Sequence, residues 1–250
     1  MADSTAQPVA LITGGSRGVG RGIVEAFHRA GYRVATCGRR PPEGEIPASF
    51  HTCDVRDPDQ VDALVAAVVS VHGRLDVLVN NAGGSPMADA ATASPRFSEA
   101  IVRLNLLAPL HCAQAANRVM QTQPEGGCIV SVASVSAIRP SPGTAAYGAA
   151  KAGLLNLTSS LAVEWAPKVR VNAVTAGPIL TEQAALHYGD AAGQAAVAAT
   201  IPAGRLGLPD DVAQACLWLC SDAASWVSGA SLLVHGGGEA PAFLAAAREG

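Results

Sequence analysis

The sequence predicts a single α/β domain in which helices cover both faces of a doubly wound parallel sheet. Short apolar runs alternate with helical patterns along the 250 residues, a glycine-rich turn follows the first run, and no linker or repeat divides the chain. Hydrophobic residues make up 49% of the chain and charged residues 15%, so one domain of this length can bury a large core. We therefore treat 1–250 as one domain and expect flexible tails at 1–7 and 239–250.

The strands of such a sheet should be continuous apolar runs, because helices bury both of their faces. The run VALI at 9–12 has this character and gives the first expected strand. Six further strands are expected at 32–37, 50–53, 75–79, 128–133, 169–174 and 231–235.

Helices are expected where apolar residues recur at helical spacing. The clearest stripe has apolar residues at 61, 64, 65, 68 and 69 and predicts a helix over 58–72. Further helices are expected from the glycine turn to about residue 30 and at 96–120, 147–165, 181–200 and 209–221, where 181–200 is an Ala-rich mobile flap and Pro209 suits a first turn. The segment 39–49 holds three prolines and two glutamates, which favours a loop over a crossover helix.

Charge and cysteine usage exclude several classes of protein. The net charge is −3, the estimated isoelectric point is about 6.0 and no basic tract is present, so nucleic acid is not an expected partner. The N-terminus lacks a signal-peptide pattern and no apolar window is long enough to span a membrane, so we expect no membrane partner. The six cysteines and six histidines show neither a Cys-x-x-Cys pair nor metal-ligand spacing. We expect a cytoplasmic protein without disulfides or bound metal.

Tyr147 and Lys151 are the first candidates for catalysis. They stand four residues apart in an Ala-rich run that favours helix, so their side chains share one helix face. A phenol ordinarily has a pKa of about 10, and a neighbouring ammonium lowers that pKa. Ser134 closes the apolar run at 128–133, where its hydroxyl can converge with the Tyr–Lys pair on one carbonyl oxygen. Only two of the 17 cationic residues are lysines, and a guanidinium would not replace the compact ammonium at Lys151.

The turn TGGSRGVG at 13–20 lies between the first strand and the first helix. Glycines at 14, 18 and 20 permit a tight turn and a close approach of the backbone to a pyrophosphate, and the following helix directs its N-terminal amides at that anion. This placement is typical of a Rossmann-type dinucleotide site.

Two arginines favour NADP(H) over NAD(H). A carboxylate at the end of the second strand would bind the adenosine ribose hydroxyls of NAD. Here that strand ends CGRR and has no acid. Arg17 in the glycine turn and Arg39 just past the second strand are placed to flank a 2′-phosphate.

These motifs together resemble the classical short-chain dehydrogenase/reductase family over about residues 8–238. The matching motifs are TGGSRGVG at 13–20, DV at 54–55, NNAG at 80–83, Asn105, Ser134, YGAAK at 147–151, GRLG at 204–207 and GG at 236–237. The chain departs from the family pattern at three places. The usual Pro-Gly after the sixth strand is Ala176-Gly177, the usual Asp after the last strand is His235, and the second crossover helix is shortened to a loop.

The resemblance implies the catalytic set Asn105, Ser134, Tyr147 and Lys151. Tyr147 would act as general acid in reduction and as base in oxidation, and Lys151 would lower its pKa and hold the nicotinamide ribose. Ser134 would bind the substrate oxygen, and Asn105 would hold a water of the proton relay. Asp54 and Val55 would meet the adenine, and Ile179 and Thr181 the nicotinamide carboxamide. With the two arginines, the expected cofactor-binding residues are Gly14, Ser16, Arg17, Gly18, Val19, Arg39, Asp54, Val55, Asn81, Ala82, Gly83, Tyr147, Lys151, Gly177, Ile179 and Thr181.

We therefore expect an NADP(H)-dependent oxidoreductase that interconverts a ketone and a secondary alcohol. The substrate should lie between the segments 84–92, 135–144 and 180–200, whose small and apolar residues fit an apolar ketone or an acyl thioester. A 3-oxoacyl-thioester reductase and a non-catalytic NADP(H)-sensing protein remain as alternatives. A sugar-nucleotide epimerase is disfavoured because the chain is too short for its extra substrate domain. The resemblance also implies a homotetramer paired through the helices at 96–120 and 147–165.

Overall fold

The computed structural model describes residues 7–241, 243 and 247. Most of the tails expected at 1–7 and 239–250 fall outside these described residues. Glu239, at the start of the second expected tail, forms an ion pair with Arg139 at 2.7 Å.

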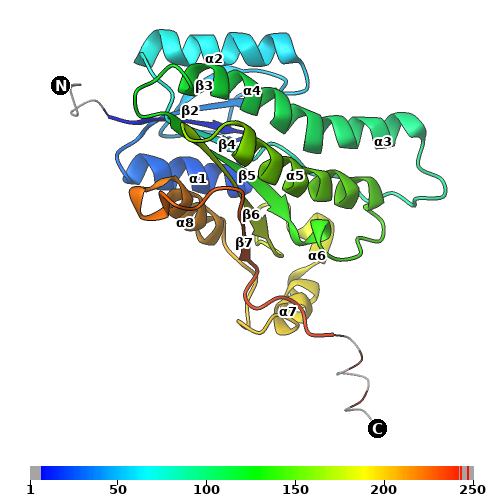
Figure 1. The fold of residues 1–250 in the computed structure, drawn as a ribbon. Helices are drawn as coiled ribbons and strands as arrows, with labels where there is room; N and C mark the ends of the chain where they lie inside the picture. The colour runs from blue at the N-terminus through cyan, green and yellow to red at the C-terminus, as the bar shows by residue number, and fades with distance from the viewer. Residues whose placement is uncertain (1–6, 242, 244–246, 248–250) are drawn as a thin grey trace.

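Seven parallel strands form one sheet in the order β3-β2-β1-β4-β5-β6-β7, which confirms the predicted doubly wound architecture (Figure 1). The strands are β1 (Val9–Thr13), β2 (Arg33–Gly38), β3 (Ser49–Thr52), β4 (Val77–Asn80), β5 (Gly127–Ser134), β6 (Val169–Ala176) and β7 (Ser231–Val234). The strand order reverses between β1 and β4, and ligands of such sheets bind beyond the carboxyl ends of the strands at this reversal.

Helices cover both faces of the sheet. The helix α1 (Gly18–Arg29) packs beside α8 (Pro209–Cys220) on one face, and α2 (Pro58–His72), α4 (Ala108–Met120) and α5 (Ala145–Glu164) cover the other (Figure 1). The chain passes from β2 to β3 through 39–48 without a helix, as the prolines there predict. Among the described residues, no helix is both long and apolar enough to cross a membrane.

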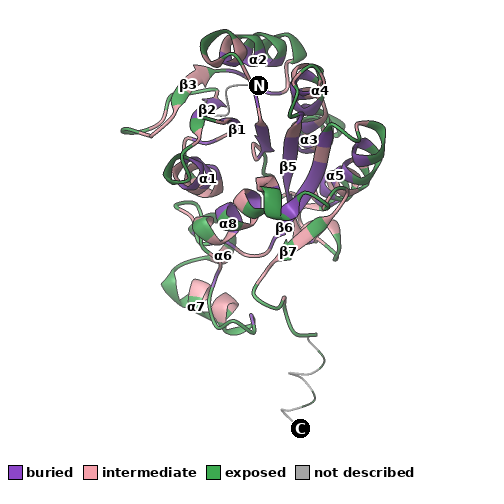
Figure 2. Cartoon of the chain, turned by 60° about the vertical axis from the view of Figure 1, so that its left-hand side comes forward, coloured by how far each residue is buried: buried purple, intermediate pink, exposed green. Residues whose placement is uncertain are grey.

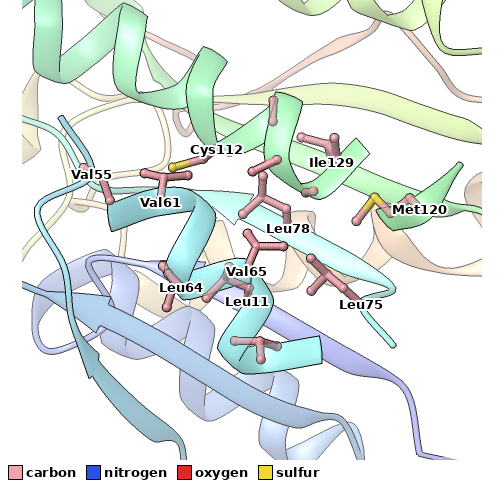
Figure 3. Close-up of a cluster of buried hydrophobic side chains, with 14 of the residues drawn as sticks. Leu11, Val55, Val61, Leu64, Val65, Leu75, Leu78, Cys112, Met120 and Ile129 are labelled. Carbon is pink, nitrogen blue, oxygen red and sulfur yellow. The ribbon is translucent and has the colours of Figure 1, made fainter. Parts of the chain in front are cut away.

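The core lies on both faces of the sheet, where β1, β4, β5 and β6 are almost wholly buried and the edge strands β3 and β7 are not (Figure 2). Figure 3 shows the cluster in which Val61 and Val65 of α2 and Cys112 of α4 pack onto Leu11 and Leu78 of the central strands. The stripe of apolar residues read from the sequence is thus the buried face of α2. This packing holds the carboxyl ends of the strands in fixed relation to one another.

The single helix expected over 96–120 is interrupted. It comprises α3 (Pro95–Val102), a π-helical turn η1 (Arg103–Leu107) and α4. An α-helix would bond the carbonyl of Asn105 to the N–H of residue 109, but Pro109 has no N–H. The Asn105 side chain also donates to the carbonyl of Ile101 at 2.9 Å. In an α-helix, that carbonyl would accept from the backbone N–H of Asn105.

The Ala-rich flap is also not one helix. It forms two short helices, α6 (Ala185–Tyr188) and α7 (Ala191–Ala199), because Asp190 starts a new helix by accepting from the N–H of Gly193 at 3.0 Å. Neither helix contains a buried residue, and both project from the sheet near its C-terminal strands (Figure 1). Two short 3₁₀ turns, η2 (Val135–Ala137) and η3 (Asp222–Ala224), were not expected from the sequence.

Candidate active site

The predicted site residues gather at one edge of the sheet, beyond the carboxyl ends of the strands. Because parallel strands end at the same edge, residues far apart in the sequence meet there. Residues 14–19 follow β1, Arg39 follows β2, Asp54 and Val55 follow β3, residues 81–83 follow β4, Ser134 ends β5, and residues 177–181 follow β6.

Tyr147 and Lys151 occupy the first two turns of α5, and the Lys151 Nζ lies 5.7 Å from the centroid of the Tyr147 ring. Lys151 is 4% exposed and donates to the carbonyl oxygen of Val132, in β5, at 2.7 Å. Burial without a carboxylate partner disfavours the charged form and lowers the pKa of Lys151 to about 8. The predicted pair therefore lies on one helix face, and β5 fixes the position of the ammonium.

The protonation of Tyr147 differs from the sequence expectation. Burial raises the pKa of Tyr147 above its ordinary value, and a hydrogen bond with Ser134 offsets only part of this rise. The predicted lowering by Lys151 is wrong for this arrangement, because the ammonium lies beside the ring and does not hydrogen-bond the phenol oxygen. Tyr147 is consequently a protonated phenol at neutral pH.

Ser134 stands where β5 passes into η2. Its hydroxyl oxygen accepts from the N–H of Ser136 at 3.2 Å. This contact uses a lone pair and leaves the hydroxyl proton free to be donated. The position of Ser134 thus allows it to donate to an oxygen atom placed between itself and Tyr147.

Asn105 lies within the π-helical turn and is completely buried. Its Oδ1 accepts from the N–H of Gly84 at 2.9 Å, and its Nδ2 donates to the carbonyls of Gly84 and Ile101 at 3.0 and 2.9 Å. The side chain therefore ties the segment after β4 to this turn. Since Pro109 leaves the backbone carbonyl of Asn105 without its α-helical donor, that carbonyl can accept from another group.

The glycine turn after β1 is fixed by neighbouring polar groups. The Thr13 hydroxyl accepts from the N–H groups of Asn81 and Ala82 at 3.0 Å each. The Asn81 amide donates to the carbonyls of Thr13 and Gly14 at 2.9 and 3.2 Å. These bonds hold the segment after β4 against the turn, and we call the sheet edge along these two segments the cofactor trough.

Close backbone approaches in this trough fit a bound dinucleotide. A Cβ at Gly20 would lie 2.2 Å from the Gly14 carbonyl oxygen, so only glycine lets α1 begin directly behind the turn. A Cβ at Gly83 would lie 2.7 Å from the Asn105 Oδ1 and 3.4 Å from the Lys151 Nζ. The trough therefore runs from the glycine turn directly to the catalytic candidates.

Arg17 and Arg39 are both exposed, and within the described residues neither guanidinium forms an ion pair. Asp54 was expected to meet the adenine, and its carboxylate forms an ion pair with Arg56. The Arg56 guanidinium donates to the Asp54 carboxylate at distances of 2.5 to 3.1 Å. These bonds lower the pKa of Asp54, and the more distant charge of Arg39 adds to the lowering. Arg39 thus lies near Asp54, and its own charge is free to bind an anion. Val55 is buried beside them.

The residues after β6 are anchored at their base. Gly177 donates to the carbonyl of Val234 at 2.9 Å, and Ile179 forms an isolated bridge with Gly207. Thr181 lies beside the glycine turn, because its methyl group would be 3.6 Å from a Cβ placed on Gly18. His235, at the position where the sequence departs from the family, packs against Gly177.

Three contributions to the site were missed from the sequence. The Val132 carbonyl that binds Lys151 had no signal, because main-chain acceptors look alike in any strand. Arg56 stands two residues after Asp54 and could have been recognised as its partner. Pro109, four residues after Asn105, marks the break in the helix. Among the described residues, no cluster of His, Cys, Asp or Glu could hold a metal ion.

Comparison with known proteins agrees with this geometry. A family model described as "Enoyl-(Acyl carrier protein) reductase" matches residues 14–239. The chain is 36% identical to a 3α-hydroxysteroid dehydrogenase of Mediterraneibacter gnavus, over 91% of this chain and 95% of that protein. It is 38% identical to an L-rhamnose 1-dehydrogenase (NAD(P)(+)) of Azotobacter vinelandii, over 91% and 94%.

The fold agrees with a solved structure in the same way. The aldohexose dehydrogenase of Thermoplasma acidophilum superposes with a TM-score of 0.88 at 32% identity, over 93% of this chain and 94% of that one. The resemblance seen in the motifs is thus confirmed over nearly the whole length. The chain belongs to the short-chain dehydrogenase/reductase family of nicotinamide-dependent oxidoreductases.

Proposed function

We propose that this chain is an NADP(H)-dependent oxidoreductase that interconverts a ketone and a secondary alcohol, with Tyr147 as the general acid and base. The observation that carries the proposal is the meeting of Tyr147, Lys151 and Ser134 where β5 ends. The trough from the glycine turn ends at the same place. Oxidation of NADPH by the purified protein, measured across a panel of ketones, tests it.

A bound nicotinamide supplies a hydride to the carbonyl carbon in reduction and accepts one in oxidation. In reduction, Tyr147 donates its phenolic proton to the carbonyl oxygen, and Ser134 donates a hydrogen bond to the same oxygen. The Lys151 ammonium beside the ring would hold the nicotinamide ribose with the donors that Val132 leaves unused. In oxidation, the phenolate of Tyr147 takes the hydroxyl proton of the alcohol. Positioned proton transfer of this kind contributes roughly 10²–10⁴-fold to the rate.

Asn105 supports the proton path through its backbone. Both Nδ2 hydrogens of its side chain are used by Gly84 and Ile101 and its Oδ1 accepts from Gly84, so we assign the water of the relay to its backbone carbonyl. Lys151 has three donors and uses one on Val132. The remaining donors are available to such a water and to the ribose hydroxyls of the cofactor. This arrangement lets the proton of Tyr147 be replenished from solvent.

The preference for NADP(H) rests on Arg17 and Arg39. Both are exposed, and the end of β2, CGRR at 37–40, contains no acid. Asp54 is held by Arg56 and does not neutralise either guanidinium through an ion pair. Two guanidinium groups without ion pairs suit a 2′-phosphate, because a guanidinium binds phosphate with charge-assisted hydrogen bonds.

The substrate is proposed to be a small apolar ketone or alcohol, or an acyl thioester. The segments 84–92, 135–144 and 180–200, which lie near Tyr147 and Ser134, expose large apolar side chains to solvent. Met87 is 66% exposed, Ile138 57% and Leu186 72%. Such exposed groups mark a surface that an apolar ligand can cover. The description of the matching family model supports a thioester, whereas the hydroxysteroid dehydrogenase relative supports an apolar ketone.

A non-catalytic NADP(H)-sensing protein is the alternative from another class. It would need the trough but not the Ser–Tyr–Lys arrangement, so binding of NADPH without turnover of any ketone or thioester would favour it. We also propose a homotetramer, and a cytoplasmic location based on the free thiols of all six cysteines.

A further inference from the structure

The carboxylate of Glu182 lies on the first turn of α1. Its Oε2 accepts from the backbone N–H of Gly18 at 3.1 Å, across 164 positions of the chain. The neighbouring Thr181 methyl group lies against the same glycine. Glu182 follows β6 and Gly18 follows β1, so the contact joins segments from opposite sides of the strand reversal.

The helix α1 has no anion of its own at this end. Its N-cap is Arg17, which makes no side-chain capping bond, and its first turn contains no acidic residue. The first N–H groups of a helix lack internal partners and attract negative charge. Glu182 therefore supplies, from a distant segment, an acceptor and a charge that the sequence of α1 lacks.

A dinucleotide would need the same amide. In this family of folds the diphosphate rests on the N-terminus of the helix that follows the glycine turn. A carboxylate and a diphosphate cannot both accept from Gly18, and their charges repel. We propose that Glu182 is a displaceable strap, which occupies the diphosphate position until the cofactor removes it. This inference rests on the proposed function only in that a dinucleotide diphosphate binds at this turn.

The strap can open without disturbing the core. Its base is fixed, because Leu180 donates to the carbonyl of Gly207 at 2.8 Å. Glu182 is itself exposed, and the helices α6 and α7 that follow contain no buried residue (Figure 2). Swinging the Glu182 side chain away from Gly18 therefore exposes no apolar core.

The strap should lower the apparent affinity for the cofactor by the fraction of molecules in which it is open. A strap that is closed in about 70–90% of molecules weakens binding about 3- to 10-fold. The effect falls on the dissociation constant of any ligand that carries the diphosphate.

The test measures dissociation constants of NADP⁺, NAD⁺ and inorganic pyrophosphate by titration calorimetry. Glu182→Gln and Glu182→Ala should bind all three about 3- to 10-fold more tightly than the unmodified protein. Glu182→Asp keeps the charge but shortens the side chain by one methylene, so it should also bind more tightly. Glu164→Gln removes an exposed charge at the other end of α5 and should change nothing.

The outcomes separate this inference from the proposed function. Unchanged or weaker binding of pyrophosphate and dinucleotides by Glu182→Gln and Glu182→Ala would overturn the strap. Equal tightening by Glu182→Gln and Glu164→Gln would also overturn it, because net charge would then explain the effect. Failure of the unmodified protein to bind either dinucleotide would reject the proposed function, while the pyrophosphate titrations would still decide on the strap.

Discussion

The Lys151 ammonium lies 5.7 Å from the centroid of the Tyr147 ring while it donates to the Val132 carbonyl at 2.7 Å. The ammonium is thus anchored to β5 beside the phenol, and it forms no ion pair with a carboxylate in the described part of the chain. The buried Lys151 and the half-buried Tyr147 have pKa values moved in opposite directions, since desolvation lowers that of Lys151 and raises that of Tyr147. Such pairs are characteristic of acid–base sites.

The lowered pKa of Lys151 predicts how cofactor capture depends on pH. The kcat/KM for NADPH reports the free enzyme, in which Lys151 has a pKa of about 8. Since the charged form binds ribose and phosphate groups best, kcat/KM should be constant below pH 8 and fall above it. Lys151→Arg should have lower kcat/KM throughout but no such fall, because a guanidinium keeps its charge. A fall that persists in Lys151→Arg would assign the titration to another group.

The raised pKa of Tyr147 predicts different pH dependences for the two reaction directions. Oxidation needs the phenolate, so its rate should rise up to tenfold per unit of pH between pH 6 and 8. Reduction needs the protonated phenol, which is present across that range, so its rate should stay nearly constant. Initial rates measured in both directions with one ketone–alcohol pair would check this. An oxidation rate independent of pH would contradict the assignment of Tyr147.

Arg39 is predicted to select NADPH. Arg39→Ala removes one guanidinium from the 2′-phosphate, and a hydrogen bond to a charged group contributes about 1.5–3 kcal/mol. The ratio of the Michaelis constants for NADH and NADPH should therefore fall about tenfold or more. Arg96→Ala removes an exposed arginine of α3 and should leave the ratio unchanged. Equal Michaelis constants for both cofactors in the unmodified protein would refute the selection.

The surface of the chain predicts assembly into a tetramer. Val163 on α5 is 81% exposed, and Trp226, just before β7, is fully exposed. Apolar side chains in these places are expected to be covered by further copies of the chain. Light scattering at micromolar concentration should give four times 25.2 kDa. The mass of one chain would contradict the prediction.

Much of the fold could be predicted from the sequence, because each local pattern favours the strand, helix or loop that forms there. The apolar runs predicted all seven strands to within two residues at every end, and the stripe at 58–72 predicted the bounds of α2. The prolines at 39–49 correctly excluded a helix. These features depend on neighbouring residues alone, which is why periodicity and turn chemistry suffice to find them.

The two errors in helix bounds had local signals, since Pro109 stands four residues after Asn105 and Asp190 caps a new helix three residues before Gly193. The bond from the Gly84 N–H to the Asn105 side chain joins residues 21 positions apart and had no local signal. The positions of the site residues followed from the order of the motifs, but their pKa values did not. The spacing of Tyr147 and Lys151 predicts proximity, whereas their protonation depends on how deeply the fold buries them.

The most direct test of the central claim is the turnover of Tyr147→Phe. This change keeps the ring and its packing but removes the proton that reaches the substrate, so NADPH should bind with a nearly unchanged dissociation constant. Turnover of a ketone that the unmodified protein reduces should fall by roughly 10²–10⁴-fold. Tyr32→Phe is the matched control, because it removes the same atom from a ring that packs on Phe27, on the α1 side of the sheet. Near-normal turnover by Tyr147→Phe would show that another group donates the proton and would contradict the account.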